Sequence, residues 1–311
     1  MSKKHIQNIV AESRRTLPIT IVYGVGIWLL AGLVNNGWWL QFTCFFASVY
    51  AMVHLSNINL LIRIYSRSVP ATYVMLSCIA VWLFPSIHGA VSQLGFVLVL
   101  LLLFACYQDQ KAQGKIFYMS AILGAMSLLE PHYLLFMPIL WFLMATTIYS
   151  LSFRTFMASV IGIITPYWLF AGWLLVLDPV NPSTLLSMIS RFGDIQFSID
   201  YHSLTASQLA YFTLLVILFI VGSIHFWTTS YMDKIRIRQI YSSLILLTLY
   251  TIVLLAVQPQ MFNVLIYMLT LAVTPIIAHF VTLTSTKASN IFFFVVIAAI
   301  AILTVVNLWI S

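Results

Sequence analysis

Residues 178–207 read DPVNPSTLLSMISRFGDIQFSIDYHSLTAS, and they form the only long interruption in a chain that is otherwise a series of apolar runs. This stretch carries three of the chain's seven acidic residues. Most of the apolar runs on either side have about the 20 residues that an α-helix needs to cross the hydrocarbon core of a membrane. They lack the strict alternation of polar and apolar residues that a β-barrel requires. The sequence therefore predicts an all-α, polytopic bundle of transmembrane helices with one long loop.

The composition supports this class of protein. Hydrophobic residues make up 62% of the chain and charged residues only 7%, which does not suit a surface that faces water. No loop is long enough to bury a core of its own, so we expect residues 1–311 to form a single integral membrane domain. The basic residues are spread over short loops instead of one patch, which argues against nucleic acid as a partner. Cys44, Cys78 and Cys106 lie inside apolar runs, show no metal-ligand spacing and are predicted to serve packing.

The apolar runs predict about eleven spans. One of them, residues 116–129, reaches only about 21 Å as a helix, which is less than the thickness of the hydrocarbon core. Either flanking residues extend this helix, or the turn Glu130-Pro131-His132 that follows it lies below the lipid surface. The spans are predicted at about 16–34, 38–61, 69–84, 90–107, 116–129, 133–150, 156–177, 208–228, 240–257, 261–281 and 290–310.

The loop charges predict the orientation, because cytoplasmic loops carry an excess of Lys and Arg. With the N-terminus in the cytoplasm and the C-terminus outside, thirteen of the fourteen basic residues fall on cytoplasmic segments, and Arg191 is the exception. The thirteen are Lys3, Lys4, Arg14, Arg15, Arg63, Arg67, Lys111, Lys115, Arg154, Lys234, Arg236, Arg238 and Lys287. The loop 178–207 is then an outer loop, and the expected location is the inner membrane of a bacterium.

Within this outer loop, the pattern predicts one helix lying in the membrane interface. Asn181 is suited to cap a helix, Pro182 to occupy its first turn and Gly193 to end it. Between them, apolar residues recur at steps of three and four, which gives the helix one apolar face. Residues 195–202 then alternate apolar and polar side chains, as in an extended segment on the outer surface.

The candidate chemistry also lies in this loop. Asp178 directly follows a span, and its carboxylate is suited to accept a proton from a sugar hydroxyl or to hold a divalent cation. Arg191 is suited to bind the phosphate of a lipid carrier. Asp194, Asp200 and His202 are candidates for substrate binding. The alternative is that these residues only solvate the loop. No metal site is predicted.

A second candidate is the turn Glu130-Pro131-His132. A Glu and a His two residues apart are able to share a proton, which makes Glu130 and His132 candidate catalytic residues. The alternative is that the turn is polar only because turns face water.

Two neighbouring segments also carry a family resemblance. KIFYMSAILGAMSLLEPHYLLFMPILWFLM (115–144) followed by LSFRTFMASVIGIITPYWLFAGWLLVLD (151–178) resembles the integral membrane glycosyltransferases of the GT-C class. The resemblance implies an outward-facing catalytic carboxylate and a polyprenyl-phosphate sugar donor. That class carries its acidic motif in the first outer loop, which here contains Asn35-Asn36-Gly37 and no acid, so Asp178 or Glu130 would have to take that role. The chain also resembles uncharacterised multi-pass proteins of the bacterial inner membrane.

Three functions remain open. The first is an enzyme of cell-envelope biogenesis that acts at the outer face on a sugar linked to polyprenyl phosphate. The second is a non-enzymatic subunit of an envelope or secretion complex, which would use the interfacial helix to bind other membrane proteins. The third is a transporter or lipid flippase that uses the central bundle. All three have membrane lipid as a partner.

Overall fold

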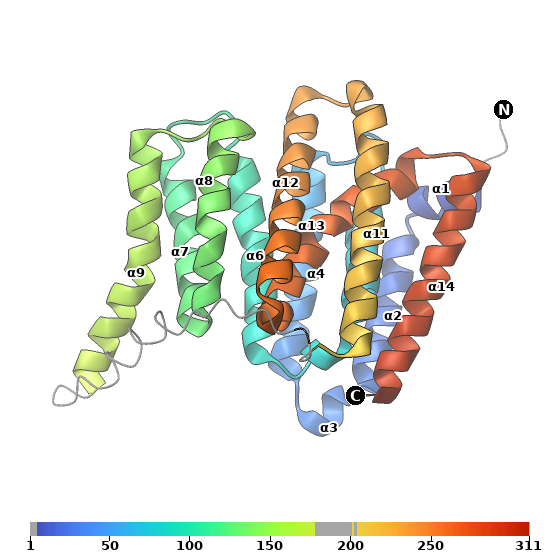
Figure 1. Cartoon of the computed structure of the whole chain (residues 1–311), viewed down its shortest axis with the longest axis horizontal. Coiled ribbons are helices and arrows are strands. Elements are labelled where there is room, and N and C mark those ends of the chain that lie inside the picture. The colour runs from blue at the N-terminus through green and yellow to red at the C-terminus, as the bar shows by residue number, and fades with distance from the viewer. Residues whose placement is uncertain (1–4, 178–200, 202–203, 311) are drawn as a thin grey trace.

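The computed structural model describes residues 5–177, 201 and 204–310, and these ranges contain helices and no strand (Figure 1). The all-α prediction is confirmed for this part of the chain. Six described segments are long and apolar enough to cross a membrane. They are α6 (Ile87–Ala105), Phe153–Val176 within α9 (Phe153–Leu177), Ala206–Met232 with α11 (Ala206–Thr229), α12 (Ile235–Val257), Pro259–Leu283 with α13 (Phe262–Leu283), and α14 (Lys287–Ile310).

The other described helices are shorter or less apolar. Successive long helices run in opposite directions, so the connections between them alternate between the two ends of the bundle (Figure 1). The remaining elements are α1 (Ile6–Glu12), α2 (Thr16–Leu30), α3 (Leu33–Asn36), α4 (Trp39–Asn59), α5 (Ser68–Ser77), α7 (Gln113–Leu129) and α8 (Phe136–Thr146), with the 3-10 turns η1 (Val81–Leu83), η2 (Pro131–Leu135), η3 (Ser230–Met232) and η4 (Pro259–Met261).

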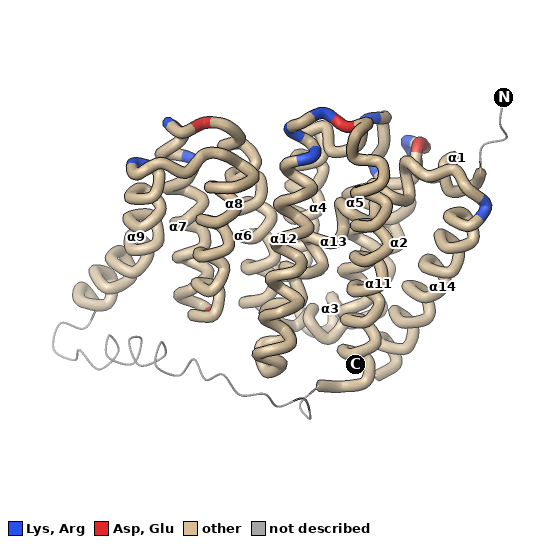
Figure 2. Tube along the Cα trace, turned by 45° about the horizontal axis from the view of Figure 1, so that its top comes forward, with Lys and Arg blue, Asp and Glu red and all other residues tan. Residues whose placement is uncertain are grey.

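Charge separates the two ends of the bundle. Every Lys and Arg of the described ranges lies at one end, which we call the basic end (Figure 2). Glu130, between α7 and α8, is the one described acid at the opposite end. The sides between the ends expose large apolar residues, among them Trp168 on α9 and Ile291 on α14. A surface with polar ends and apolar sides matches the layers of a lipid bilayer.

The core lies around α13. Most of its side chains between Phe262 and His279 are buried, because α13 packs against α5, α6, α11 and α12. Helices α9 and α14 stand at the two edges of the bundle and are mostly exposed (Figure 1).

The predicted span at residues 69–84 is not continuous. Helix α5 ends at Ser77, and an irregular segment that contains η1 leads to α6. Lipid-exposed irregular backbone is not tolerated inside a membrane, but backbone buried in protein is. Here four side chains from other helices donate hydrogen bonds to carbonyl groups around the break. The pairs are Asn307 to Ile79 at 2.8 Å, Tyr211 to Leu76 at 3.1 Å, Gln41 to Pro85 at 3.1 Å and Tyr267 to Leu83 at 3.3 Å.

Two further boundaries differ from the predicted spans. Helix α2 ends at Leu30 instead of continuing to residue 34, because Gly32 adopts a left-handed conformation with φ of 97°. Helix α7 begins at Gln113 and has 17 residues, or about 25 Å, so flanking residues do extend the short predicted span.

Helices α7 and α9 approach each other through glycine. A Cβ atom added to Gly162 of α9 would lie 2.1 Å from Ser120 Oγ and 2.6 Å from the carbonyl oxygen of Phe117. A Cβ atom added to Gly124 of α7 would lie 2.7 Å from the carbonyl oxygen of Ile163. Small residues allow membrane helices to pack this closely. Pro166 lies within α9 without ending it.

Candidate functional site

Two of the predicted site residues, Glu130 and His132, lie in the described ranges, and the structure brings them together. His132 Nδ1 lies 2.9 Å from Glu130 Oε1. The other predicted site residues are outside the described residues, as is the whole of the predicted interfacial helix of the loop 178–207. They are Asp178, Arg191, Asp194, Asp200 and His202.

The local backbone positions this pair. Helix α7 ends at Leu129, Glu130 is extended, and Pro131 starts the turn η2 that carries His132. The His132 side chain is 8% exposed and the Glu130 side chain 32% exposed, so the carboxylate is accessible and the imidazole is largely enclosed. In the tautomer in which Nδ1 donates to the carboxylate, Nε2 is left as an acceptor. The pair is therefore equipped to take up a proton at the opposite end.

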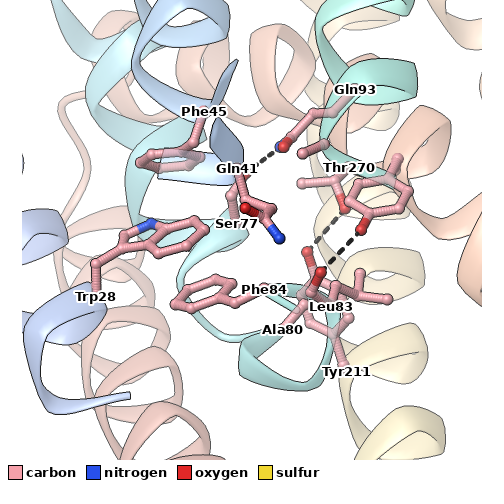
Figure 3. A pocket seen from close by; sticks show the side chains of 12 residues that line it. Trp28, Gln41, Phe45, Ser77, Ala80, Leu83, Phe84, Gln93, Tyr211 and Thr270 are labelled. Carbon is pink, nitrogen blue, oxygen red and sulfur yellow. Dashed lines mark hydrogen bonds between the residues drawn. The ribbon is translucent and has the colours of Figure 1, made fainter. Parts of the chain in front are cut away.

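A small cavity lined by both apolar and polar side chains lies beside the break between α5 and α6 (Figure 3). Its volume is about 30 Å³, which is room for one or two water molecules. Gln93 Nε2 lies 3.5 Å from Ser77 Oγ, and the hydroxyl oxygens of Tyr211 and Thr270 lie 2.7 Å apart. Trp28 and Phe84 close one side as stacked rings with centroids 3.9 Å apart. The cavity therefore offers hydrogen-bonding groups to a polar molecule, but it must widen to admit anything larger than water.

A third cluster, which the sequence analysis did not identify, lies at the basic end. Asp233, just after η3, has a side chain that is only 1% exposed. Its carboxylate oxygens lie 3.1 Å from His279 Nε2 and 3.9 Å from Arg63 Nη1. The His225 ring lies 5.5 Å from that of His279, centroid to centroid. These contacts tie the α4–α5 connection, α11, α13 and the start of α12 together.

We call the cluster of Asp233, His279, Arg63 and His225 the clamp. A buried carboxylate is stable when it is paired and hydrogen-bonded, and His279 and Arg63 supply its partners. Within the described ranges, no group of three His, Cys, Asp or Glu side chains is placed to hold a metal ion. The arrangement therefore joins four segments of the chain.

The chain matches no family model, no curated protein and no solved structure. The assignment of a function therefore depends on the chemistry of the Glu130–His132 pair, the cavity beside the break between α5 and α6, and the cluster around Asp233.

The sequence contained a partial signal for the clamp. Asp233 is the one acid in the stretch 233–238, which otherwise carries Lys234, Arg236 and Arg238, and it stands out for that reason. Its partners are 46 residues away at His279 and 170 residues away at Arg63, and no local spacing relates them. His279 lies near the end of a predicted span and is nonetheless fully buried.

Proposed function

We propose that eleven segments of this chain cross the inner membrane of a bacterium, with the basic end in the cytoplasm. The support is the alternating direction of successive helices together with the position of every described Lys and Arg at one end (Figure 2). The shortest helix among the proposed spans, α5, is buried on nearly all sides by other helices, so the thickness of the lipid does not set its length. The eleven segments are α2, α4, α5 with η1, α6, α7, η2 with α8, α9, α11, α12, α13 and α14.

We further propose that the protein is an enzyme of cell-envelope biogenesis that acts on a sugar linked to polyprenyl phosphate. The reaction takes place at the end of the bundle opposite the basic end, on the outer side of the membrane. The observation that carries this proposal is the contact of 2.9 Å between Glu130 and His132 at that end. An exposed carboxylate beside an enclosed imidazole is a suitable general base for a hydroxyl group.

In this reaction, Glu130 accepts the proton of the attacking hydroxyl group as the hydroxyl oxygen bonds to the anomeric carbon of the sugar. The bond between that carbon and the phosphate oxygen breaks, and its electron pair leaves with the phosphate. His132 holds the carboxylate in place and shares the proton. Asp178 keeps its predicted role as an alternative base or cation ligand, and Arg191 its predicted role in phosphate binding.

Replacement of the Glu130 carboxylate should strongly lower the rate of sugar transfer without unfolding the protein. In liposomes that contain a polyprenyl phosphate carrying one radiolabelled sugar, we expect Glu130→Gln to lower label transfer by about 100-fold or more, the usual contribution of a general base. His132→Gln should lower it less, because the carboxylate remains. Asp109→Asn at the basic end is the control and should retain the wild-type rate.

Two results would contradict the enzyme proposal. The first is a wild-type protein that transfers no label, and the second is transfer at the wild-type rate by both Glu130→Gln and Asp178→Asn. If Asp178→Asn loses activity while Glu130→Gln keeps it, the base lies in the outer loop instead of at the turn η2.

The break between α5 and α6 favours a second function, the transport or flipping of a polar lipid headgroup. Interrupted membrane helices form the substrate sites of many transporters, because free backbone groups and polar side chains meet there. The cavity at Ser77, Gln93 and Tyr211 shares one part of this arrangement, because polar side chains meet there beside a helix break (Figure 3). The carbonyl groups at the break already accept hydrogen bonds from side chains.

Transport requires the cavity to open. In a variant whose three cysteines are replaced by alanine, we expect Ser77→Cys to react about tenfold faster with a membrane-impermeant maleimide when the liposomes contain polyprenyl phosphate. Thr213→Cys, on the exposed side of α11, is the control and should react at one rate in both lipid mixtures. A Ser77→Cys rate that is also unchanged by the carrier would exclude this mechanism.

A further inference from the structure

A second cavity, at the basic end, separates α14 from the rest of the bundle. It lies between α2, α5 and α14, beneath α1, and its volume is about 510 Å³. Its walls are almost entirely apolar and include Ile19, Met75, Phe293, Ile297 and Ala301. We call it the α2–α14 groove.

Helix α1 covers the upper end of this groove, and two of its polar side chains are buried. Gln7 and Asn8 are buried, whereas Ile6 and Ile9 are about half exposed. The Gln7 amide donates to the carbonyl of Val281 at 2.6 Å, and the Asn8 amide donates to the carbonyl of Thr284 at 2.7 Å. Polar side chains thus fasten α1 to the end of α13, while Ile9, Val10 and Ala11 line the groove.

A hydrogen bond between α2 and α14 closes the lower end of the groove. The Tyr23 hydroxyl of α2 lies 3.0 Å from the Thr304 hydroxyl of α14, and both side chains are wholly or partly buried. Along α14, the lining residues run from Phe293 to Ala301, which corresponds to a depth of about 12 Å. The groove is therefore bounded at both ends along the bundle, while exposed lining residues such as Ile19 leave its side open.

Cations surround the upper end. Arg15, at the start of α2, and Lys287, at the start of α14, are both exposed. Arg14 lies over the ring of Tyr65 at 5.8 Å, and Glu12 is the one described acid nearby in the chain. These four side chains leave a net positive charge at the depth of the lipid headgroups.

We propose that the α2–α14 groove binds one acyl chain of an anionic glycerophospholipid from the leaflet at the basic end, with its phosphate near Arg15 and Lys287. Lipid tails are as apolar as the groove, so the apolar contact alone cannot select one lipid over another. The headgroup charge provides the selection. This site is independent of the proposed enzyme or transport function, because it lies at the other end of the bundle from Glu130.

The test is the lipid that the full-length protein retains after extraction from vesicles of equal parts phosphatidylglycerol and phosphatidylcholine, measured by native mass spectrometry. We expect one retained phosphatidylglycerol per chain. The double variant Arg15→Gln/Lys287→Gln should lower its occupancy relative to phosphatidylcholine by about 25-fold, from a factor of about five for each charge. The matched control Lys111→Gln/Arg154→Gln removes two exposed charges at the same end near α7 and α9, and should retain the lipid.

A second pair of variants tests the groove itself. Ala301→Phe places a ring in the groove and should displace the lipid while leaving both cations in place. Val295→Phe adds a ring to an exposed position of α14 outside the groove lining and should retain the lipid. Equal retention of the two phospholipids by the wild type would overturn the proposal, as would equal retention of phosphatidylglycerol by Ala301→Phe and Val295→Phe. Neither result bears on sugar transfer, which the Glu130→Gln assay reports.

Discussion

Gly162→Ala is expected to lower the free energy of unfolding by about 3 kcal/mol. The added Cβ atom would lie 2.6 Å from the carbonyl oxygen of Phe117, a backbone atom of α7 that cannot rotate away. Overpacking of a tight contact costs about 1–3 kcal/mol, and a rigid partner places this contact at the upper end of that range. Equilibrium unfolding in mixed micelles of mild detergent and dodecyl sulfate measures the change.

The matched control lies on the same helix. Gly172 of α9 has no atom within 4 Å of an added Cβ, so Gly172→Ala meets no neighbour. It should leave stability unchanged or raise it by up to about 1 kcal/mol, because alanine favours the helix more than glycine does. If both substitutions stabilise the protein, α9 does not pack against α7 through Gly162.

Asp233→Ala is expected to lower the free energy of unfolding by about 3 kcal/mol as well. The carboxylate is buried between His279 and Arg63, and removing one partner of a buried pair typically costs 3–5 kcal/mol. We expect the lower end of this energy range because the Arg63 side chain is 31% exposed, so its guanidinium group can be hydrated once the carboxylate is removed. The same unfolding measurement in mixed micelles applies.

An exposed ion pair at the same end provides the comparison. Asp109 lies 3.9 Å from Lys115, and both side chains are more than 40% exposed. Asp109→Ala should therefore cost less than about 1 kcal/mol. In the double variant Asp233→Ala/His279→Phe, the loss should be smaller than the sum of the two single losses, because the two side chains contact each other. Strict additivity would show that Asp233 and His279 do not interact.

Much of the architecture was predictable because it follows from properties of single segments. A run of apolar residues must form a helix in lipid whatever its neighbours are, so the helices α6, α9 and α11–α14 were all located within about five residues of their ends. The gathering of basic residues at one end was predictable for a similar reason. The excess of Lys and Arg in cytoplasmic loops applies to each loop separately. Figure 2 shows that the basic residues of the described loops lie together at one end of the bundle.

The candidate site was predictable only where its residues are neighbours in the chain. Glu130 and His132 are two residues apart, and a turn was enough to bring them together at 2.9 Å. The clamp at Asp233 joins residues from four segments, and each partner taken alone resembles an ordinary polar residue at the end of a span. The break after Ser77 was equally invisible, because its buried carbonyls depend on Tyr211, Tyr267 and Asn307 from distant helices.

The sequence by itself thus determined that the segments of this protein suit an apolar environment, that they are helical, and that the basic residues lie at one end. Hydrophobicity and charge act on each segment independently, which is why these features were predictable. Only the tertiary structure decided which polar groups are buried together, where a span is interrupted and where α14 stands away from the bundle. Those features depend on the packing of side chains that are far apart in the chain. Hydrogen bonds such as Tyr23–Thr304 and Asn8–Thr284 form only once the helices have assembled.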